Sequence, residues 1–522
     1  MRTLQTPRHR HVEHRRGLSQ HTHAPADRGR DQNRAGQTRL GLKPRAPRLP
    51  PRSARHPPEA SAMHRPRRPA RRTVLKAAAC AALCAAAPAS RPRPPNVLML
   101  LSDDQQADTI HALGNDRIST PALDELVARG TTFTRAYIMG AMQGAVCVPS
   151  RSMLLTGRTL FRSPDQPPAD IPLWPEVFRK AGYHAFVTGK WHNGPATLSR
   201  CFDSGASIFF GGMTNQSRIP IADFDPHGRY GPATRRVVER FSSELFADAA
   251  VEFLRGYRSD RPFFMWVAFT APHDPRTPPG KYARMYDPAS IPLPGNFMPR
   301  HPFDNGELNV RDEKLLPVPR EPDAVRREIA AYYGMISHMD EHIGRILAAL
   351  HDRPDADNTI IIFAGDNGLA LGQHGLLGKQ NLYEHSVRVP LVMSGPQLPS
   401  GRKVPGLCYL LDVFPTVCQL AGVPVPQGVE GRSLAPLAAG HQRDGRSSLL
   451  FAYRRIQRAI SDGRWKLIRY FVGNTTTTQL FDLHNDPLEM KNLSADASCA
   501  AELARLSALL EKHRRDAADP LA

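Results

Sequence analysis

The sequence predicts an α/β fold: a large mixed, mostly parallel sheet sandwiched by helices, with a smaller C-terminal antiparallel-sheet subdomain. The first observation is a set of apolar runs that stop abruptly at polar residues, at 96–101, 184–187, 263–269 and 359–363. Short continuous apolar runs are typical of parallel strands buried on both faces. The second observation is that amphipathic stretches lie between or after them, at 120–129, 174–181, 242–257, 322–350 and 412–421. Strands that alternate with helices favour a sheet covered on both sides.

The first 95 residues carry most of the net positive charge. The chain of 522 residues has a formal net charge of +20, but 22 of its 69 Lys and Arg residues and only 4 of its 49 acidic residues precede position 96. The rest of the chain is nearly neutral, so no nucleic-acid partner is predicted for the folded part. Its apolar stretches are too short or too interrupted for a bundle of membrane-spanning helices.

The leader divides into two segments. Residues 1–62 are rich in Arg, Pro and His, and we expect them to be disordered. Residues 63–93 run from paired arginines through an Ala-rich stretch to Ala87-Pro88-Ala89, the order of a twin-arginine-like signal peptide. Because such a signal normally starts a chain, we interpret Met63 as the initiator and the residues before it as untranslated. The mature protein is then predicted to be periplasmic or extracellular, with no stable membrane span after signal removal.

Beyond the signal we expect a catalytic domain over 94–440 and a C-terminal subdomain over 441–522. Within the first, the stretches 202–236 and 275–322 are rich in Pro, Gly and Arg and are predicted to be long loops or small insertions that shape a substrate pocket. The subdomain is predicted to form a small antiparallel sheet and a helix, from segments at 449–453, 459–461, 465–470, 479–483 and 500–514.

Acidic pairs follow two of the predicted strands. In open α/β sheets, ligands bind beyond the carboxyl ends of the strands. Asp103-Asp104 and Asp366-Asn367 lie at such ends and would together supply oxygen ligands with three formal negative charges. This donor set suits Ca²⁺ or Mg²⁺ rather than zinc. Either pair alone is equally compatible with an ordinary surface turn.

Basic residues follow the strands as well. Lys190 and His192 are two residues apart at a strand end, which places both on one face. His273 ends another strand, and Lys379 lies in a Gly-rich loop. A cationic cluster beside a metal ion indicates a sulfate or phosphate ester as substrate. Each of these residues alone is equally compatible with a structural or solvated side chain.

The segment 147–158 reads Cys-Val-Pro-Ser-Arg-Ser-Met-Leu-Leu-Thr-Gly-Arg. Pro149 suits a first helical turn and Gly157 a helix end, so Cys147 is predicted to lie just before a helix amino terminus. The N–H groups there favour an anion, and Arg151 would add a forked donor. A lone cysteine is otherwise most simply a small buried apolar residue. The other six cysteines form no CxxC pair, no zinc spacing and no recognisable disulfide pattern: Cys80, Cys84, Cys201, Cys408, Cys418 and Cys499.

Cys-x-Pro-Ser-Arg followed by Leu-Thr-Gly-Arg resembles the signature of the type I, formylglycine-dependent sulfatases of the alkaline phosphatase superfamily. In that family the cysteine is converted to Cα-formylglycine. The resemblance covers essentially the whole mature chain, roughly residues 94 to 495, with motifs in the family's order. They are Asp103-Asp104, Gly189-Lys190-Trp191-His192, Pro272-His273, Asp366-Asn367-Gly368, Lys379 before Tyr383-Glu384, Arg388-Val389-Pro390-Leu391, and Leu480-Phe481-Asp482-Leu483 with Asp486-Pro487, Glu489 and Asn492-Leu493.

The resemblance implies a mechanism. The aldehyde at position 147 would be hydrated, one hydroxyl would attack sulfur, and the second would later expel sulfate. Ca²⁺, with Mg²⁺ less favoured, would be held by Asp103, Asp104, Asp366 and Asn367 together with position 147. Arg151 would orient the hydrate and His192 would act as the base for sulfate release. Lys190 and Lys379 would bind sulfate oxygens, and His273 or Lys379 would protonate the leaving oxygen.

The predicted function is therefore that of an exported sulfatase, matured by a formylglycine-generating enzyme and acting on a sulfated small molecule or polysaccharide. A carbohydrate sulfate is preferred because of export and of polar residues in the predicted loops, namely Arg218, Arg229, Tyr230, Arg276 and Tyr282. The nearest alternative is a phosphonate monoester or phosphodiester hydrolase of the same superfamily. Two others are a noncatalytic calcium-binding module and a nucleic-acid binder that acts through the basic leader.

Overall fold

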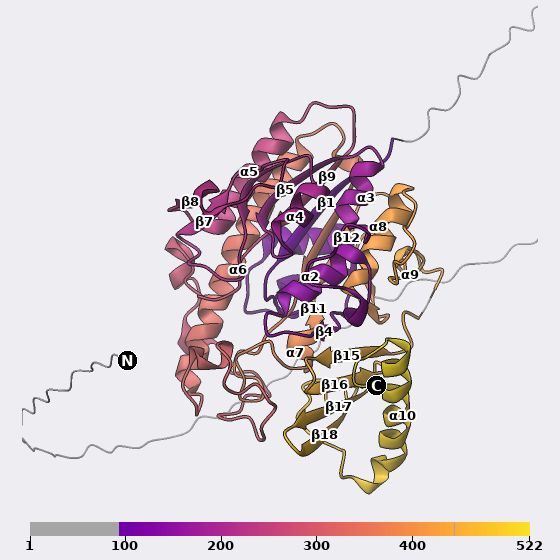
Figure 1. Cartoon of the computed structure of the whole chain (residues 1–522). Coiled ribbons are helices and arrows are strands. Elements are labelled where there is room, and N and C mark those ends of the chain that lie inside the picture. Colours follow the sequence, from indigo (N-terminus) through magenta and orange to yellow (C-terminus); the bar gives the residue numbers. More distant parts are fainter. Residues whose placement is uncertain (1–92, 443) are drawn as a thin grey trace, which may run out of the picture. The chain divides into compact units, whose positions relative to one another are not determined.

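The computed structural model describes residues 93–442 and 444–522, which fall within one compact unit (Figure 1). The predicted disordered extension over 1–62 and the export signal over 63–93 therefore lie outside the described residues, apart from Arg93. The division of the mature chain at residue 440 stays a prediction.

A mixed sheet of ten strands forms the centre of this unit, as predicted. Its order is β13-β2-β12-β10-β1-β9-β5-β6-β7-β8, and the five strands from β10 to β6 run parallel. The strands are β1 (Asn96–Ser102), β2 (Thr131–Phe133), β5 (His184–Lys190), β6 (Ser204–Phe209), β7 (Ile219–Ala222), β8 (Arg235–Val238), β9 (Phe263–Ala268), β10 (Thr359–Gly365), β12 (Leu391–Ser394) and β13 (Arg402–Val404).

Helices cover both faces of the sheet, and the side chains of β1 show why. Val97, Met99 and Leu101 point into one core with α2, α3, α4 and α8, whereas Leu98 and Leu100 point into a second core with α1, α5 and α6. This alternation buries every residue of the central strand. The helices are α1 (Pro121–Arg129), α2 (Cys147–Thr156), α3 (Trp174–Lys180), α4 (Pro195–Cys201), α5 (Ser242–Gly256), α6 (Pro322–His351), α7 (Glu384–Val387), α8 (Val413–Ala421), α9 (Ala435–Ala439) and α10 (Ala500–Asp516).

The stretch 202–236 forms a small insertion rather than a long loop. It contains β6, β7 and the first half of β8, which extend the main sheet at one edge. Only the second half of β6 is fully buried, and β8 is largely exposed, so neither shows the continuous apolar pattern of the central strands. The stretch 275–322 does match its prediction, because within it the structure has only short 3₁₀ turns before α6 begins.

A second sheet forms near the carboxyl terminus, where it was predicted. It contains β15 (Leu449–Tyr453), β16 (Gln457–Ser461), β17 (Trp465–Val472) and β18 (Thr475–Asp482), with α10 packed against them. Its fifth strand was not predicted: β4 (Gly140–Ala141) pairs in parallel with β15, six residues before α2. A further small sheet joins β3 (Ala136–Tyr137), β11 (Arg388–Val389) and β14 (Cys408–Tyr409).

Within the part of the chain that the structure describes, no helix has the length and apolar character needed to cross a bilayer. The five cysteines of that part are free thiols.

Gly189 determines the backbone conformation at the end of β5, where Lys190 lies. Its φ is 95°, and the register of β5 against β6 shifts between Thr188 and Gly189. A Cβ at this position would overlap the carbonyl oxygen of Ala268 on β9. The last turn of β5 therefore requires glycine both for its backbone conformation and for the close approach of the neighbouring strand.

We expect Gly189→Ala to lower the free energy of unfolding by about 3 kcal/mol or more, because backbone strain and overlap with β9 add together. Gly182→Ala is the matched control, since its φ is 96° but nothing lies within 4 Å of the added Cβ. Backbone strain alone should cost about 1–2 kcal/mol there. Urea unfolding measures both, and equal losses would show that the contact with Ala268 is unimportant.

Candidate active site

The predicted acidic and basic residues meet at one edge of the main sheet. Asp103-Asp104 follow β1, Asp366-Asn367 follow β10, Lys190 ends β5, and His273 lies beyond β9. These four strands are parallel neighbours, so their carboxyl ends share that edge. Backbone bonds hold the strand ends together: Asp366 N donates to Ser102 O at 3.1 Å, and Asp103 N donates to Ala271 O at 3.1 Å.

Helix α2 presents Cys147 to this edge. Cys147 is the first residue of the helix, rather than the one before it, and every residue of α2 is buried. Arg151 lies one turn further on. Its Nε donates to Asp366 Oδ2 at 2.8 Å and its Nη1 donates to Lys190 O at 3.1 Å. Arg151 therefore ties the helix to the ends of β10 and β5.

The carboxylates pair with the basic residues predicted to lie opposite them. Lys190 Nζ donates to Asp103 Oδ2 at 2.5 Å. Lys379 Nζ donates to both carboxylate oxygens of Asp104, at 2.6 and 2.8 Å. His273 Nε2 lies 3.5 Å from Asp104 Oδ2. All five side chains are at least nine-tenths buried, so these contacts form in a water-poor interior where charges interact strongly.

Position 147 lies among these groups. The Sγ atom of Cys147 is 3.3 Å from Nδ1 of His192 and 3.6 Å from Nζ of Lys190. Burial raises the pKa of the Cys147 thiol, an effect that the positive charge of Lys190 opposes. Burial and the charge of Lys190 lower the pKa of His192 to about 2, so this imidazole is neutral.

Burial and charge act differently on the individual carboxyls. Burial alone would raise the pKa of Asp104, but the nearby His273 and Lys379 outweigh it and hold that pKa well below its usual range. Burial and the negative charge of Asp103 raise the pKa of Asp366 to about 6. Such opposed shifts in adjacent buried groups are typical of active sites.

The donor atoms fit a hard divalent cation. Ligand atoms of Asp103, Cys147 and Asp366 lie within 4.8 Å of one another. Among the described residues, Asp103 Oδ1 and Asn367 Oδ1 are buried oxygens without a hydrogen-bond donor. A buried oxygen without a donor is costly, and a bound cation would remove that cost. Because the donors are oxygens with position 147 as the exception, Ca²⁺ or Mg²⁺ fits better than zinc.

An open pocket of about 350 Å³ leads to this cluster. Cys147, His192, His273 and Lys379 line it, together with residues that sequence reasoning did not single out: Met213, Arg311, Asp312, Gln380 and Arg454. None of the five loop residues favoured for substrate binding (Arg218, Arg229, Tyr230, Arg276 and Tyr282) lines this pocket.

Tyr332 is another residue that the sequence did not reveal. Its hydroxyl donates to the carbonyl oxygen of Asp104 at 2.7 Å and accepts from Gln106 N at 2.9 Å. Asp104 has a φ of 63°, a left-handed conformation that is unusual for aspartate. Tyr332 on α6 thus holds the turn that aims Asp104 at Lys379, a role that no local sequence pattern indicates.

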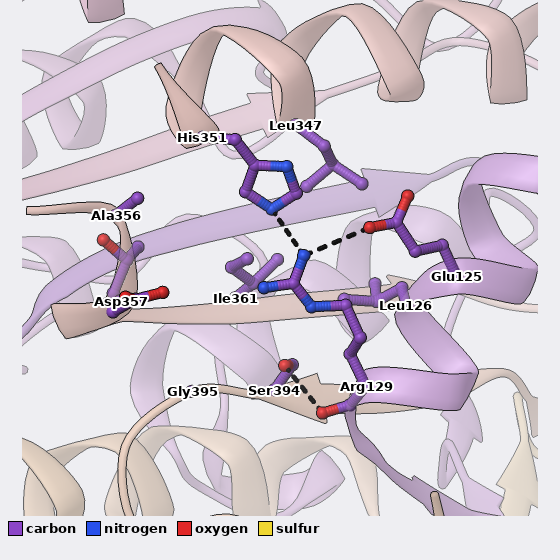
Figure 2. A pocket seen from close by; sticks show the side chains of 11 residues that line it. Glu125, Leu126, Arg129, Leu347, His351, Ala356, Asp357, Ile361, Ser394 and Gly395 are labelled. Atoms are coloured by element: carbon purple, nitrogen blue, oxygen red, sulfur yellow. Dashed lines mark hydrogen bonds and ion pairs between the residues drawn. The ribbon is translucent and has the colours of Figure 1, made fainter. Parts of the chain in front are cut away.

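A smaller cavity of about 80 Å³ lies at the opposite end of β10 (Figure 2). Arg129 crosses it, donating to Glu125 Oε1 at 3.1 Å and contacting His351 Nε2 at 2.9 Å. Thr359 and Ile361, from the first half of β10, line its wall. Its arginine is already paired and the strand ends that carry the acidic residues are remote, so it takes no part in the site described above.

Comparison with known proteins agrees with this architecture. Residues 95–423 match the family model of the sulfatases, and residues 372–516 match that of the N-sulphoglucosamine sulphohydrolase C-terminal region. The sheet, its carboxyl-edge site and these matches define a sulfuric ester hydrolase. The first match spans more than half of the chain, and the protein belongs to the sulfatase family.

The individual relatives are distant in sequence. An N-acetylglucosamine-6-O-sulfatase of Bacteroides thetaiotaomicron is 25% identical over 500 residues, covering 81% of this chain and 87% of that protein. A structure solved in complex with its substrate D-glucosamine-2-N,6-O-disulfate has a TM-score of 0.68 at 22% identity, covering 82% of this chain and 99% of the other. The phosphonate monoester hydrolase of Agrobacterium radiobacter has a TM-score of 0.65 at 23% identity, with 81% and 96% covered. Both structures have the same fold as this chain.

Proposed function

We propose that this sulfatase hydrolyses a carbohydrate sulfate through a formylglycine formed from Cys147, with Ca²⁺ held by Asp103, Asp104, Asp366 and Asn367, and that it is exported. The single observation that carries the proposal is the placement of Cys147, within 4.8 Å of two of these carboxylates and at the start of a buried helix. The sequence around Cys147 supports the conversion, and the segment 63–93 supports export and maturation by a formylglycine-generating enzyme.

When present, the hydrated aldehyde and the cation would supply an acidic hydroxyl as nucleophile. The chain's own residues supply the rest. Arg151, fixed by Asp366 and the carbonyl of Lys190, brings its positive charge close enough to position 147 to interact with it. Lys190 and Lys379 flank that position and provide donors for sulfate oxygens. His192 Nδ1 lies within reach of a proton on the side chain at 147.

The leaving group would meet basic residues that line the pocket. His273 and Lys379 both line the pocket, so either can deliver a proton to the departing oxygen. His273 Nδ1 contacts the carbonyl oxygen of Asp274 at 2.9 Å, which directs Nε2 toward Asp104 and the site. These are the predicted roles of the basic residues, and the distances are compatible with each.

A carbohydrate with a second anionic group fits the pocket rim best. Arg454, at the turn between β15 and β16, is about half exposed and lines the pocket beside Gly144. Its Nη1 contacts Glu307 Oε1 at 3.0 Å, and its own backbone has a φ of 43°. An arginine held in a sparsely populated conformation at a pocket rim is suited to bind a sulfate or carboxylate on the leaving group.

The nucleophile is tested by replacing Cys147. We expect Cys147→Ala to abolish sulfate release from an aryl sulfate while the unfolding transition stays cooperative, because the side chain that would be converted is gone. Mass spectrometry of the peptide that contains position 147 should show the aldehyde in the protein without substitutions. Hydrolysis that persists in Cys147→Ala would contradict the assignment. If the protein without substitutions prefers phosphonate monoesters or phosphodiesters to sulfates, the alternative hydrolase is favoured.

The cation is tested by chelation. Removal of divalent ions should lower the rate of aryl sulfate hydrolysis at least about 100-fold, since the buried carboxylates lose the charge that organises them. Added Ca²⁺ should restore the rate and raise the thermal unfolding midpoint. Mg²⁺ should restore less, because it prefers fewer protein ligands and retains its waters. Full activity in excess chelator would refute a required cation.

The leaving-group contact is tested with Arg454→Gln, using D-glucosamine-2-N,6-O-disulfate and a simple aryl sulfate as substrates. Loss of one charge-assisted contact should raise the KM for the disulfated sugar about tenfold and the KM for the aryl sulfate much less. Arg455→Gln is the control, because this neighbouring exposed arginine does not line the pocket. Equal changes for both substrates would show that Arg454 does not read the second anion.

A further inference from the structure

A cluster of metal-ligating side chains lies between α5 and α6, apart from the catalytic edge. Glu244 is in the first turn of α5, and His338 and His342 are one turn apart on α6. Ligand atoms of the three residues lie within 4.8 Å of one another. Neither the sulfatase chemistry nor the fold described above gives these residues a task.

The distances match those around a tetrahedral zinc ion. His338 Nε2 lies 3.0 Å from His342 Nε2 and 3.5 Å from Glu244 Oε1. Two ligands about 2.0–2.1 Å from a tetrahedral ion are separated by roughly 3.3 Å. The two ring nitrogens and the carboxylate oxygen thus already converge on one point. Two His and one carboxylate are a ligand set that zinc accepts, with water at the fourth position.

The imidazoles are held in the form and orientation that ligation needs. Both are buried, and Phe241 and Tyr282 pack edge-on against His338, with ring centroids at 4.5 and 5.1 Å. Burial and the neighbouring His342 lower the pKa of His338 to about 3, and burial and Arg345 lower the pKa of His342 to about 4. Both rings are therefore neutral at neutral pH, as a metal ligand must be.

One polar atom in the cluster is left unsatisfied. Within the described residues, Nδ1 of His338 is buried without a hydrogen-bond partner. A histidine placed only to pack in the core would be expected to satisfy both of its nitrogens. The orientation observed instead directs Nε2 of His338 toward Glu244 and His342, at the cost of the other nitrogen.

We propose that Glu244, His338 and His342 form a second metal site, which binds Zn²⁺ or a similar borderline divalent cation and braces α5 against α6. The site depends on neither the conversion of Cys147 nor the calcium ligands. Both helices lead to the catalytic edge: Ser242 of α5 bonds to Gln216, which holds His273 O, and Tyr332 of α6 holds Asp104 O.

Arg345 sets the proton arrangement of the metal-free cluster. Its Nη1 donates to Nδ1 of His342 at 3.1 Å, so His342 carries its proton on Nε2 and donates it to His338 Nε2. When a cation takes the place of that proton, the proton must move to Nδ1 and Arg345 must release its contact. Arg345 is about half exposed, and it can keep its contact with Asp248, to which its Nη2 donates at 2.6 Å. Arg345 is therefore expected to weaken metal binding.

The test uses the full protein, stripped of divalent ions and reloaded with excess Ca²⁺ so that the catalytic oxygens are occupied. Titration with Co²⁺ should then add one equivalent, with the visible absorption of a four-coordinate, nitrogen-ligated ion, and Zn²⁺ should displace it and raise the unfolding midpoint. Glu244→Gln and His342→Gln should each lower the Co²⁺ affinity about 100-fold. Arg345→Gln should raise it about tenfold, because a positive charge and a competing donor are removed.

Matched controls are Glu252→Gln on α5 and His351→Gln at the end of α6, both exposed and outside the cluster, and neither should change the affinity. If His342→Gln does not fold, Glu244→Gln decides, since that side chain is one-third exposed. Failure of the Ca²⁺-loaded unmodified protein to take up Co²⁺, or uptake that Glu244→Gln leaves unchanged, overturns the site. Either result would leave the assignment of Cys147 untouched.

Discussion

The balance of buried charge at the carboxyl edge of the main sheet is the constraint on which the rest of the structure depends. Three carboxylates, of Asp103, Asp104 and Asp366, are withdrawn from water there. Burying unpaired charges costs several kcal/mol each, so each carboxylate needs a partner of opposite sign. Arg151, Lys190 and Lys379 are those partners. The fold must therefore bring a helix, a strand end and a loop to one point, and the parallel order of β10, β1, β9 and β5 achieves this.

The carboxyl-terminal sheet contributes to the geometry of the active site through β4. Because Gly140 and Ala141 pair with β15, the chain that enters α2 is fixed to the later sheet only six residues before Cys147. A Cβ at Gly140 would overlap the carbonyl oxygen of Ala452, so the two backbones approach as closely as glycine allows. The same connection places Arg454, just past the end of β15, at the pocket rim. One short pair of strands thus connects the position of Cys147 with that of Arg454, the residue proposed to contact the leaving group.

Sequence reasoning reached the parts of this arrangement that strong local signals encode. The central strands were predictable because burial on both faces produces unbroken apolar runs, and the site followed because polar residues end those runs. It failed where pairing depends on partners far away in the chain. The strand β4 is two residues long and β8 is exposed, so neither has a pattern of its own. Tyr332 and Arg454 act through contacts over long sequence separations, and the loop arginines favoured instead lie away from the pocket.

Different parts of the site tolerate substitution to different degrees. The groups that would hold the cation and the sulfuryl oxygens come from buried strand ends, from the start of α2 and from the buried loop that carries Lys379. One altered charge there leaves its partner unpaired in the interior. The groups that would meet the leaving alcohol, such as Arg311 and Arg454, come from a loop and a hairpin turn, and both are about half exposed. Replacing an exposed rim side chain costs little stability. Because of this difference, a change of substrate can arise at the rim without disturbing the buried charges, and relatives of one fold can act on different esters.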